Sequence, residues 1–299
     1  MSGEQMVPVN GVELCTQTFG SPDDPTLLLV AGMSSPMDWW DVGLCERLAA
    51  GGRCVIRYDL RDTGRSTTYP PGAPAYTGAD LRRDVVALLD ALEVDAAHLV
   101  GISMGGAMAQ CIAVEHPGRV RSLTLIDTTA ALPGVTASLP GVEPALAALF
   151  EAAAARGEPD WTDKAAVVDR LVDEQRAFMR AGFEESRVRA TATQVVERST
   201  DVAAAQNHAL LDPGPAPAGS LADISAPTLV VHGTADPLFP LPHGEALAQA
   251  IPRAALLVLD GVGHEPPPPS HWAVFVRALL EHTSGEFEPA ALPALADSP

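Results

Sequence analysis

Ser103 lies between two glycines in the sequence Gly101-Ile102-Ser103-Met104-Gly105. The apolar residues 97–100 before it predict a strand, and residues 106–115 after it predict a helix that stops before Pro117. Glycines two residues away on either side let the chain turn sharply, in a strained geometry that exposes the serine hydroxyl. The helix N-terminus below offers free N–H groups to a developing negative charge. This pattern predicts a nucleophilic serine, although a glycine-rich turn that merely holds a serine has the same spacing.

A serine that attacks a carbonyl group needs a general base, and histidine suits this task at neutral pH. His264 is the candidate among eight histidines, because the loop Gly261-Val262-Gly263-His264 directly follows the last predicted strand. Its glycines leave the ring accessible at the same end of the sheet as Ser103. His271 is expected to be a surface or helix-capping group, and His232 to pack in a turn. The remaining histidines have no supporting context: His98, His116, His208, His243 and His282.

An acidic residue must hold the histidine tautomer and stabilise the imidazolium ion. Asp236 fits this role because it lies just beyond the penultimate predicted strand, in the sequence HGTADP. Asp127 is the rival, since it ends the strand after the serine helix, but it is expected instead to anchor the start of an inserted segment. Asp260 is too close to His264 along the chain to bond its ring comfortably. We therefore expect the order serine, aspartate, histidine at positions 103, 236 and 264.

Two backbone N–H groups are needed to stabilise the oxyanion of a tetrahedral intermediate. One is expected from Met104, the residue after the serine. The other is expected from Met33, in the loop that follows the early apolar strand 27–30. The thioethers of these two methionines would then line an apolar acyl pocket, and core packing is the alternative for each of them.

The elements that must position these residues alternate between strand and helix along the chain. This alternation predicts a mostly parallel sheet with helices on both faces, an α/β fold. The strands are expected at 12–19, 27–30, 53–58, 97–100, 123–126, 227–232 and 255–259. The helices outside the inserted segment are expected at 38–49, 80–92, 106–115, 243–251 and 272–282.

The alternation breaks between residues 132 and 211, which are alanine-rich and helical in pattern. An insertion at this point lies over the carboxyl ends of the strands, where open parallel sheets bind their ligands. We therefore predict a core of residues 1–131 and 212–284, and a helical cap of residues 132–211 that shapes the substrate pocket. Residues 285–299 are expected to be a disordered tail. The aromatic residues of the cap are Phe150, Trp161, Phe178 and Phe183.

Composition narrows the classes of partner. The 299 residues carry a formal net charge of −19, and a surface this acidic repels phosphate backbones and anionic lipids. The charge therefore predicts neither a nucleic-acid nor a membrane partner. The serine, aspartate and histidine described above predict a small-molecule ester as substrate. The N-terminus has no secretory pattern and the four cysteines lack metal-type spacing, so we expect a cytoplasmic protein with reduced cysteines. The sequence gives no oligomeric state.

These residues resemble the α/β-hydrolase superfamily from Val7 to about His282, with its order of serine, aspartate and histidine. A narrower likeness is to the aclacinomycin methylesterase branch, enzymes that act on anthracycline polyketide methyl esters. That likeness lies in RYDLRDTGRST at 57–67, in the GVEL start, in the Gly-x-Ser-Met-Gly turn, and in the segments APTLVVHGTADPLFP and GVGH. The resemblance implies that a methyl ester is cleaved without a metal or cofactor. Read physically, residues 57–67 form a loop whose charged groups pair and brace the sheet edge.

Two features depart from that family pattern. Many relatives have His-Gly before the residue that donates to the oxyanion, whereas this chain has Ala31-Gly32, so the loop must be braced differently. The run Pro266–Pro269 after His264 is expected to be stiff and extended, and to narrow the pocket entrance. Neither departure removes a group expected to act in catalysis.

The sequence is thus interpreted as a serine hydrolase that cleaves a carboxylic ester through an acyl-enzyme. The main alternative is a cofactor-free haloperoxidase (perhydrolase) on the same residues, in which peroxide attacks the acyl-enzyme. A further alternative is a hydrolase fold that binds a ligand without turnover, because fold alone does not determine function. A haloalkane dehalogenase is disfavoured, since it would need an aspartate where Ser103 stands.

Overall fold

The computed structural model describes residues 3–285 and contains a single sheet of eight strands. The expected strands are all present with slightly different ends, and one further strand, β1, precedes them. β1 was not predicted, since its short run contains Pro8 and lies at the edge of the sheet. The strands are β1 Gln5–Val9, β2 Val12–Phe19, β3 Thr26–Val30, β4 Cys54–Tyr58, β5 Ala97–Ile102, β6 Val120–Ile126, β7 Thr228–Gly233 and β8 Ala254–Leu259.

The strands lie in the order β1-β2-β4-β3-β5-β6-β7-β8. β2 pairs antiparallel with β1 and with β4, and every other neighbouring pair is parallel. The carboxyl ends of the six parallel strands therefore meet at one edge of the sheet. The loops after β3, β5, β6, β7 and β8 all begin at this edge, which brings together the residues expected to do chemistry.

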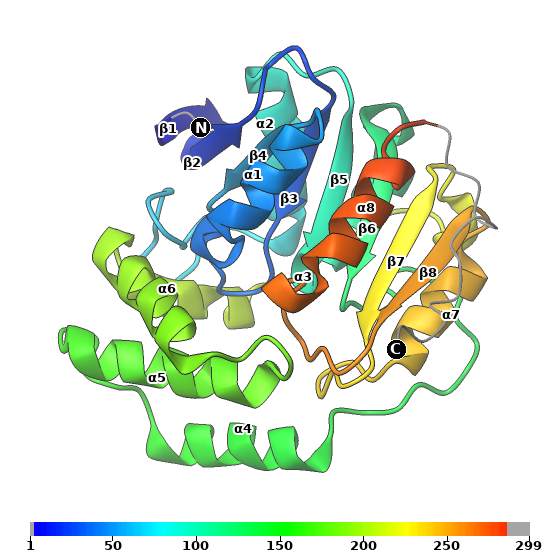
Figure 1. Ribbon diagram of the computed structural model, residues 1–299. Coiled ribbons are helices and arrows are strands. Elements are labelled where there is room, and N and C mark those ends of the chain that lie inside the picture. The colour runs from blue at the N-terminus through cyan, green and yellow to red at the C-terminus, as the bar shows by residue number, and fades with distance from the viewer. Residues whose placement is uncertain (1–2, 286–299) are drawn as a thin grey trace.

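Helices cover both faces of the sheet, as the alternation predicts. In Figure 1, α1 and α8 lie on one face, while α2, α3 and α7 lie on the other. Within β3, Leu27 and Leu29 join the apolar cluster beneath α1 and α8, and Leu28 and Val30 join the cluster on the opposite face. Successive side chains of a strand point to opposite faces, so a strand covered on both sides is apolar throughout. These helices are α1 Val42–Ala50, α2 Gly78–Ala91, α3 Met104–Glu115, α7 Pro242–Ala250 and α8 Trp272–His282.

The helix expected at 38–49 is interrupted. A 3₁₀ turn, η1 (Met37–Trp39), is followed by α1, which begins after Asp41. The Asp41 side chain accepts a hydrogen bond from the N–H of Gly43 and caps α1 at its N-terminus. The short polar side chain of Asp41 therefore determines where the regular helix starts.

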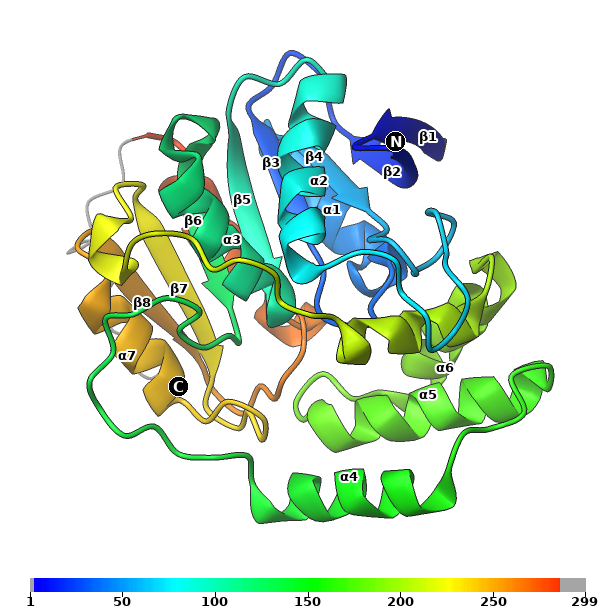
Figure 2. The ribbon, with the colours of Figure 1, turned by 180° about the vertical axis from the view of Figure 1, so that it is seen from behind.

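Residues 132–211, here called the helical segment, lie across the carboxyl ends of the strands in both views (Figures 1 and 2). Gly157 follows the first helix of the segment, and Gly182 lies between the second and the third. Buried valines of the second and third helices form a separate apolar cluster. The helical segment consists of α4 Pro144–Arg156, α5 Lys164–Phe178, α6 Glu185–Arg198 and the 3₁₀ stretch η3 Val202–Leu210.

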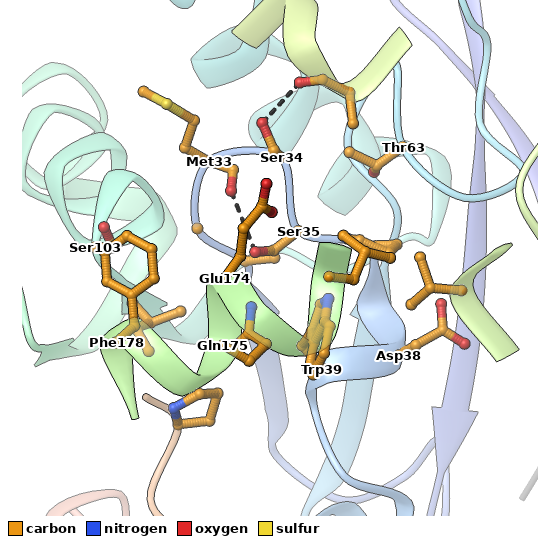
Figure 3. Close-up of a pocket in the computed structure, with 18 of the residues that line it drawn as sticks. Met33, Ser34, Ser35, Asp38, Trp39, Thr63, Ser103, Glu174, Gln175 and Phe178 are labelled. Carbon is orange, nitrogen blue, oxygen red and sulfur yellow. Dashed lines mark hydrogen bonds between the residues drawn. The ribbon is translucent and has the colours of Figure 1, made fainter. Parts of the chain in front are cut away.

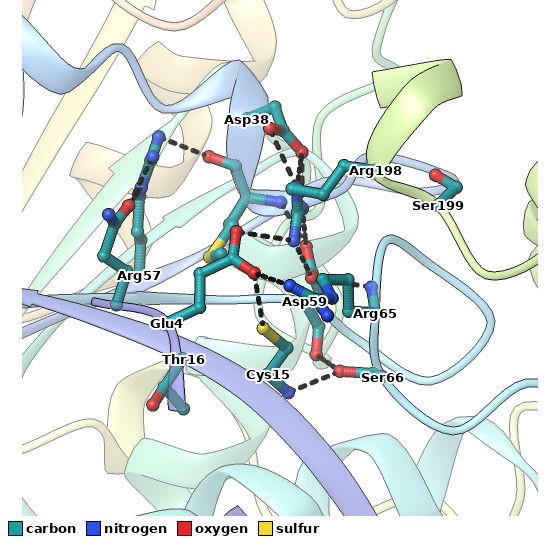
Figure 4. A network of polar contacts seen from close by, with 12 residues as sticks. Glu4, Cys15, Thr16, Asp38, Arg57, Asp59, Arg65, Ser66, Arg198 and Ser199 are labelled. Atoms are coloured by element: carbon teal, nitrogen blue, oxygen red, sulfur yellow. Dashed lines mark hydrogen bonds and ion pairs between the residues drawn. The ribbon is translucent and has the colours of Figure 1, made fainter. Parts of the chain in front are cut away.

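Arg198, at the end of α6, joins the helical segment to the core (Figure 4). Its guanidinium pairs with Asp38 in η1 and with Asp59, which follows β4. The Asp38 and Asp59 side chains are 2% and 0% exposed, so these are buried ion pairs. Other charged residues of the loop at 57–67 also form ion pairs with residues outside the loop: Arg61 binds Asp84, and Arg65 binds Glu4.

We expect Arg198→Met to lower the free energy of unfolding by about 3–5 kcal/mol, since it leaves two buried carboxylates without their partner. Arg65→Met is the matched control, because the Arg65 side chain is 57% exposed in its pair with Glu4. That control should cost at most about 1 kcal/mol. Urea unfolding of both variants measures the difference, and equal losses would contradict this account of Arg198.

No helix within residues 3–285 is long and apolar enough to span a membrane. All four cysteines are buried and unpaired in this part of the chain: Cys15, Cys45, Cys54 and Cys111. The tail expected to be disordered, 285–299, lies outside the described residues except for Gly285.

Candidate active site

Ser103 occupies a turn between β5 and α3 that its flanking glycines make possible. Its backbone has φ 53° and ψ −120°, a left-handed conformation that is strained for a residue with a side chain. A Cβ at Gly101 would overlap the backbone of Gly105, and a Cβ at Gly105 would overlap the carbonyl of Val30 in the neighbouring strand. Both glycines are therefore required for the helix to start this close to the sheet.

His264 lies in the loop after β8, as expected, and its ring is held from several sides. Nδ1 of His264 is 2.9 Å from Oδ2 of Asp236. The rings of Phe178 and Phe239 both lie close to it, with centroids 5.8 and 5.6 Å from the imidazole. The contact with Asp236 requires a proton on Nδ1, which leaves Nε2 free to accept one. Ser103 and His264 line the same cavity.

Asp236 lies beyond β7 and is buried. Its Oδ1 accepts hydrogen bonds from the N–H groups of Leu238 and Phe239, at 2.8 and 2.9 Å. These two bonds fix the carboxylate and direct its other oxygen at His264. The sequence HGTADP therefore supplies both the aspartate and the turn that orients it.

Asp127, the rival acid, forms no hydrogen bond with His264. Its Oδ1 accepts the N–H of Gly233, so it joins the ends of β6 and β7 instead of anchoring the start of the helical segment. Burial raises the pKa of Asp127 well above its usual range, and the nearby charge of Asp236 raises it further. The carboxyl group that faces His264 is thus Asp236.

Within residues 3–285, Asp127, His232 and Asp236 bring three potential metal-ligand atoms within 4.8 Å of one another. Each of the three residues forms a hydrogen bond within the protein. Nε2 of His232 donates to the carbonyl of Phe239 at 2.6 Å, so the ring supports the turn that also holds Asp236. Burial lowers the pKa of His232 and favours its neutral form. His232 packs in the turn, in agreement with the expectation from the sequence.

Met33 and Met104, the expected donors to an oxyanion, both line the cavity that contains Ser103. Met104 is the first residue of α3, so its N–H has no partner within the helix. The loop after β3 passes close to the serine: a Cβ at Gly32 would lie 3.4 Å from Cβ and 4.0 Å from Oγ of Ser103. The structure therefore brings both backbone segments close to the serine.

Glu265 is a residue of the site that sequence reasoning missed. It directly follows His264, is buried, and its Oε1 accepts N–H groups from Arg180 and Gly182 in the helical segment, at 2.8 and 3.2 Å. The N–H of His264 donates to the carbonyl of Phe178 at 3.0 Å. The loop that carries His264 is thus bonded to the end of α5. A glutamate before four prolines gives no local signal of such a role.

A cavity of about 730 Å³ lies between the carboxyl ends of the strands and the helical segment. Figure 3 shows Ser103 and Phe178 on one side of it, Trp39 and Asp38 on another, and Glu174 and Gln175 on α5. Of the four aromatic residues singled out in the helical segment, Phe150, Trp161 and Phe178 line the cavity, whereas Phe183 packs against the segment's own apolar cluster. Pro266 and Pro267 also form part of the wall.

The fold and this arrangement agree with a family model described as alpha/beta hydrolase fold, which matches residues 25–268. The chain belongs to the α/β-hydrolase fold family. It is similar to the rhodomycin D methylesterase DauP of Streptomyces sp. (strain C5), with 31% identity over 93% of this chain and 97% of that one. The rhodomycin D methylesterase DnrP of Streptomyces peucetius is 30% identical over the same shares. These matches confirm the resemblance to the methylesterase branch.

Proteins with lower sequence identity to this chain carry names other than methylesterase. The 3-oxoadipate enol-lactonase 2 of Acinetobacter baylyi is 29% identical over 83% of this chain and 85% of its own. Among solved structures, the enol-lactonase from Burkholderia xenovorans LB400 superposes with a TM-score of 0.69 at 23% identity, covering 93% of this chain and 99% of that one. This structural likeness shows the fold.

Proposed function

We propose that this protein is a serine esterase that cleaves a carboxylic ester through an acyl-enzyme intermediate. The observation that carries the proposal is the hydrogen bond between His264 and Asp236, at the cavity where Ser103 occupies its strained turn. A nucleophile, a base and a residue that orients the base are the elements that acyl transfer requires. Membership of a hydrolase family with methylesterase relatives supports ester hydrolysis independently.

In this mechanism the Ser103 hydroxyl attacks the ester carbonyl carbon while Nε2 of His264 accepts its proton. Asp236 stabilises the imidazolium that forms. The N–H groups of Met33 and Met104 stabilise the negative oxygen of the tetrahedral intermediate. His264 then protonates the departing alkoxide, and a water molecule activated by the same ring hydrolyses the acyl-enzyme. No step needs a metal or an organic cofactor.

The cavity and the relatives suggest the class of substrate. A volume of about 730 Å³ with Phe150, Trp161 and Phe178 in its wall fits a bulky aromatic acyl group better than a short aliphatic one. The similar rhodomycin D methylesterases are named for a methyl ester substrate. We propose the methyl ester of a polycyclic aromatic acid as the substrate class, with the helical segment as the cap that covers it.

Hydrolysis of p-nitrophenyl esters from acetate to decanoate tests the esterase proposal, with the Ser103→Ala variant beside the wild type. Serine-dependent turnover is the expected result, and the preferred chain length measures the acyl site. Methyl esters of polycyclic aromatic acids follow as the next substrates. If the wild type reacts with a fluorophosphonate probe yet hydrolyses no ester, the proposal fails and perhydrolysis or ligand binding takes its place.

A further inference from the structure

The loop that carries Met33 is held from the helical segment through the next residue, Ser34. The Ser34 N–H donates to Nδ1 of His208 at 2.9 Å, and its hydroxyl donates to the carbonyl of Ala205 at 2.7 Å. Ser34 has φ +57°, a left-handed conformation that a serine adopts at an energetic cost. A loop in this conformation needs bonds from its surroundings, and both of these come from η3, 171 and 174 positions away in sequence.

The two hydrogen bonds of His208 determine its tautomer. A backbone N–H can only donate, so Nδ1 must accept from Ser34 and carries no proton. A carbonyl can only accept, so Nε2 carries the proton and donates to Arg61 O at 2.8 Å. The ring must be neutral for both bonds to exist. His208 is 3% exposed, and this burial lowers its pKa in favour of the neutral form, against the opposing influences of the hydrogen bond to Arg61 O and the charge of Asp62.

The part of η3 that holds Ser34 is itself fixed to the core. Asn207, next to His208, is buried and its side-chain amide donates to Oδ2 of Asp62 at 3.0 Å. The Asn207 side-chain carbonyl accepts the N–H of Gly72 at 2.7 Å. His208 therefore lies on a stretch of backbone that is fixed to the core. Its hydrogen bond to Ser34 holds the loop of Met33 in a defined position.

We propose that His208 is a positioning residue for the oxyanion site: it holds Ser34, and so directs the preceding N–H of Met33 toward the substrate. This inference rests on the proposed esterase function. It also explains the departure at Ala31-Gly32, because Ala31 has no side chain that could brace the loop from within. The hydrogen bonds that hold the loop come instead from the helical segment. The same segment would therefore cover the substrate and position the N–H group that stabilises the oxyanion.

Three variants at position 208 separate positioning from packing. In H208N, the side-chain oxygen takes the place of Nδ1 and can accept the Ser34 N–H. In H208Q, the side-chain amide reaches toward Arg61 O but does not replace the acceptor for Ser34. The H208A variant loses both contacts of the ring. His98→Asn is the matched control, since His98 is a buried histidine with a hydrogen bond to Ser122, far from this site in the sheet.

Steady-state hydrolysis of the best p-nitrophenyl ester is measured for all four variants, together with inhibition by a trifluoromethyl ketone that mimics the tetrahedral intermediate. We expect H208A and H208Q to lower kcat about 10- to 100-fold, less than or similar to the loss of a whole oxyanion donor. KM should change by less than about threefold, because the ground-state ester gains little from this N–H. Affinity for the ketone should fall in parallel with kcat, and H208N should recover both.

Equal kcat in wild type, H208A and H208Q would overturn the proposal, as would an H208N variant as impaired as H208Q. Thermal unfolding is measured for each variant. If H208A does not fold, the comparison of Asn with Gln still decides the matter. A wild type without Ser103-dependent turnover would instead refute the esterase function, so the two failures are distinguishable.

Discussion

Replacing Ser103 by alanine is expected to lower kcat for ester hydrolysis at least about a thousandfold while the protein remains folded. The substitution removes the only atom proposed to bond covalently with the acyl group, and background hydrolysis in the cavity cannot replace it. Stability should not suffer, because the turn owes its shape to Gly101 and Gly105 and not to the serine hydroxyl. The Ser103 hydroxyl is not needed to cap α3 either, as it makes no capping hydrogen bond.

The measurement is single-turnover and steady-state hydrolysis of a p-nitrophenyl ester, with thermal unfolding of both proteins as the control for folding. Labelling by a fluorophosphonate should disappear in the same variant. Turnover near the wild-type rate in a folded Ser103→Ala protein would exclude the proposed mechanism.

Asp236→Asn is expected to lower kcat by about 10⁴-fold, the loss seen when a triad aspartate becomes an amide. The amide cannot stabilise the imidazolium ion. The amide can also donate its N–H to Nδ1 of His264, which favours the tautomer that carries its proton on Nε2. In that tautomer Nε2 cannot accept the serine proton. The bonds from Leu238 and Phe239 can still form to the remaining oxygen, so the turn should keep its shape.

Asp127→Asn is the matched control, because the two carboxyl groups are buried side by side. Its oxygen can still accept the Gly233 N–H, and burial raises the pKa of Asp127, so an uncharged amide is a smaller change there than at an exposed aspartate. We expect a loss of less than about tenfold, since no triad role is removed. Comparable losses in both variants would mean that His264 depends on the pair and not on Asp236 alone.

Much of the architecture could be predicted from the sequence because its signals are local. Apolar runs of strand length alternate with amphipathic stretches, and this was sufficient for a mostly parallel sheet. The turn at Ser103 is equally local, since the need for Gly101 and Gly105 arises from contacts with the adjacent strand and helix. Asp236 and His264 could be placed together because each follows a strand whose carboxyl end lies at the same edge.

The contacts that join loops across the cavity could not be predicted. His208 and Ser34 are 174 positions apart, and Glu265 bonds to residues 83 and 85 positions earlier. The groups that meet across the cavity depend on how the helical segment packs on the sheet. The periodic pattern of apolar residues does not predict this packing. β1 was missed for a different reason, because a short edge strand that contains a proline has a weak signal.

The bonds from η3 to Ser34 and from the end of α5 to the loop of His264 have a consequence for protein engineering. Exchanging the segment that covers the sheet between related α/β-hydrolases is one way to seek a new substrate specificity. In this chain, such a graft would remove hydrogen-bond partners of both loops that face Ser103. A chimera would need to retain residues 178–182 and 205–208 of this chain, and vary the rest, to keep the geometry of the proposed catalytic centre.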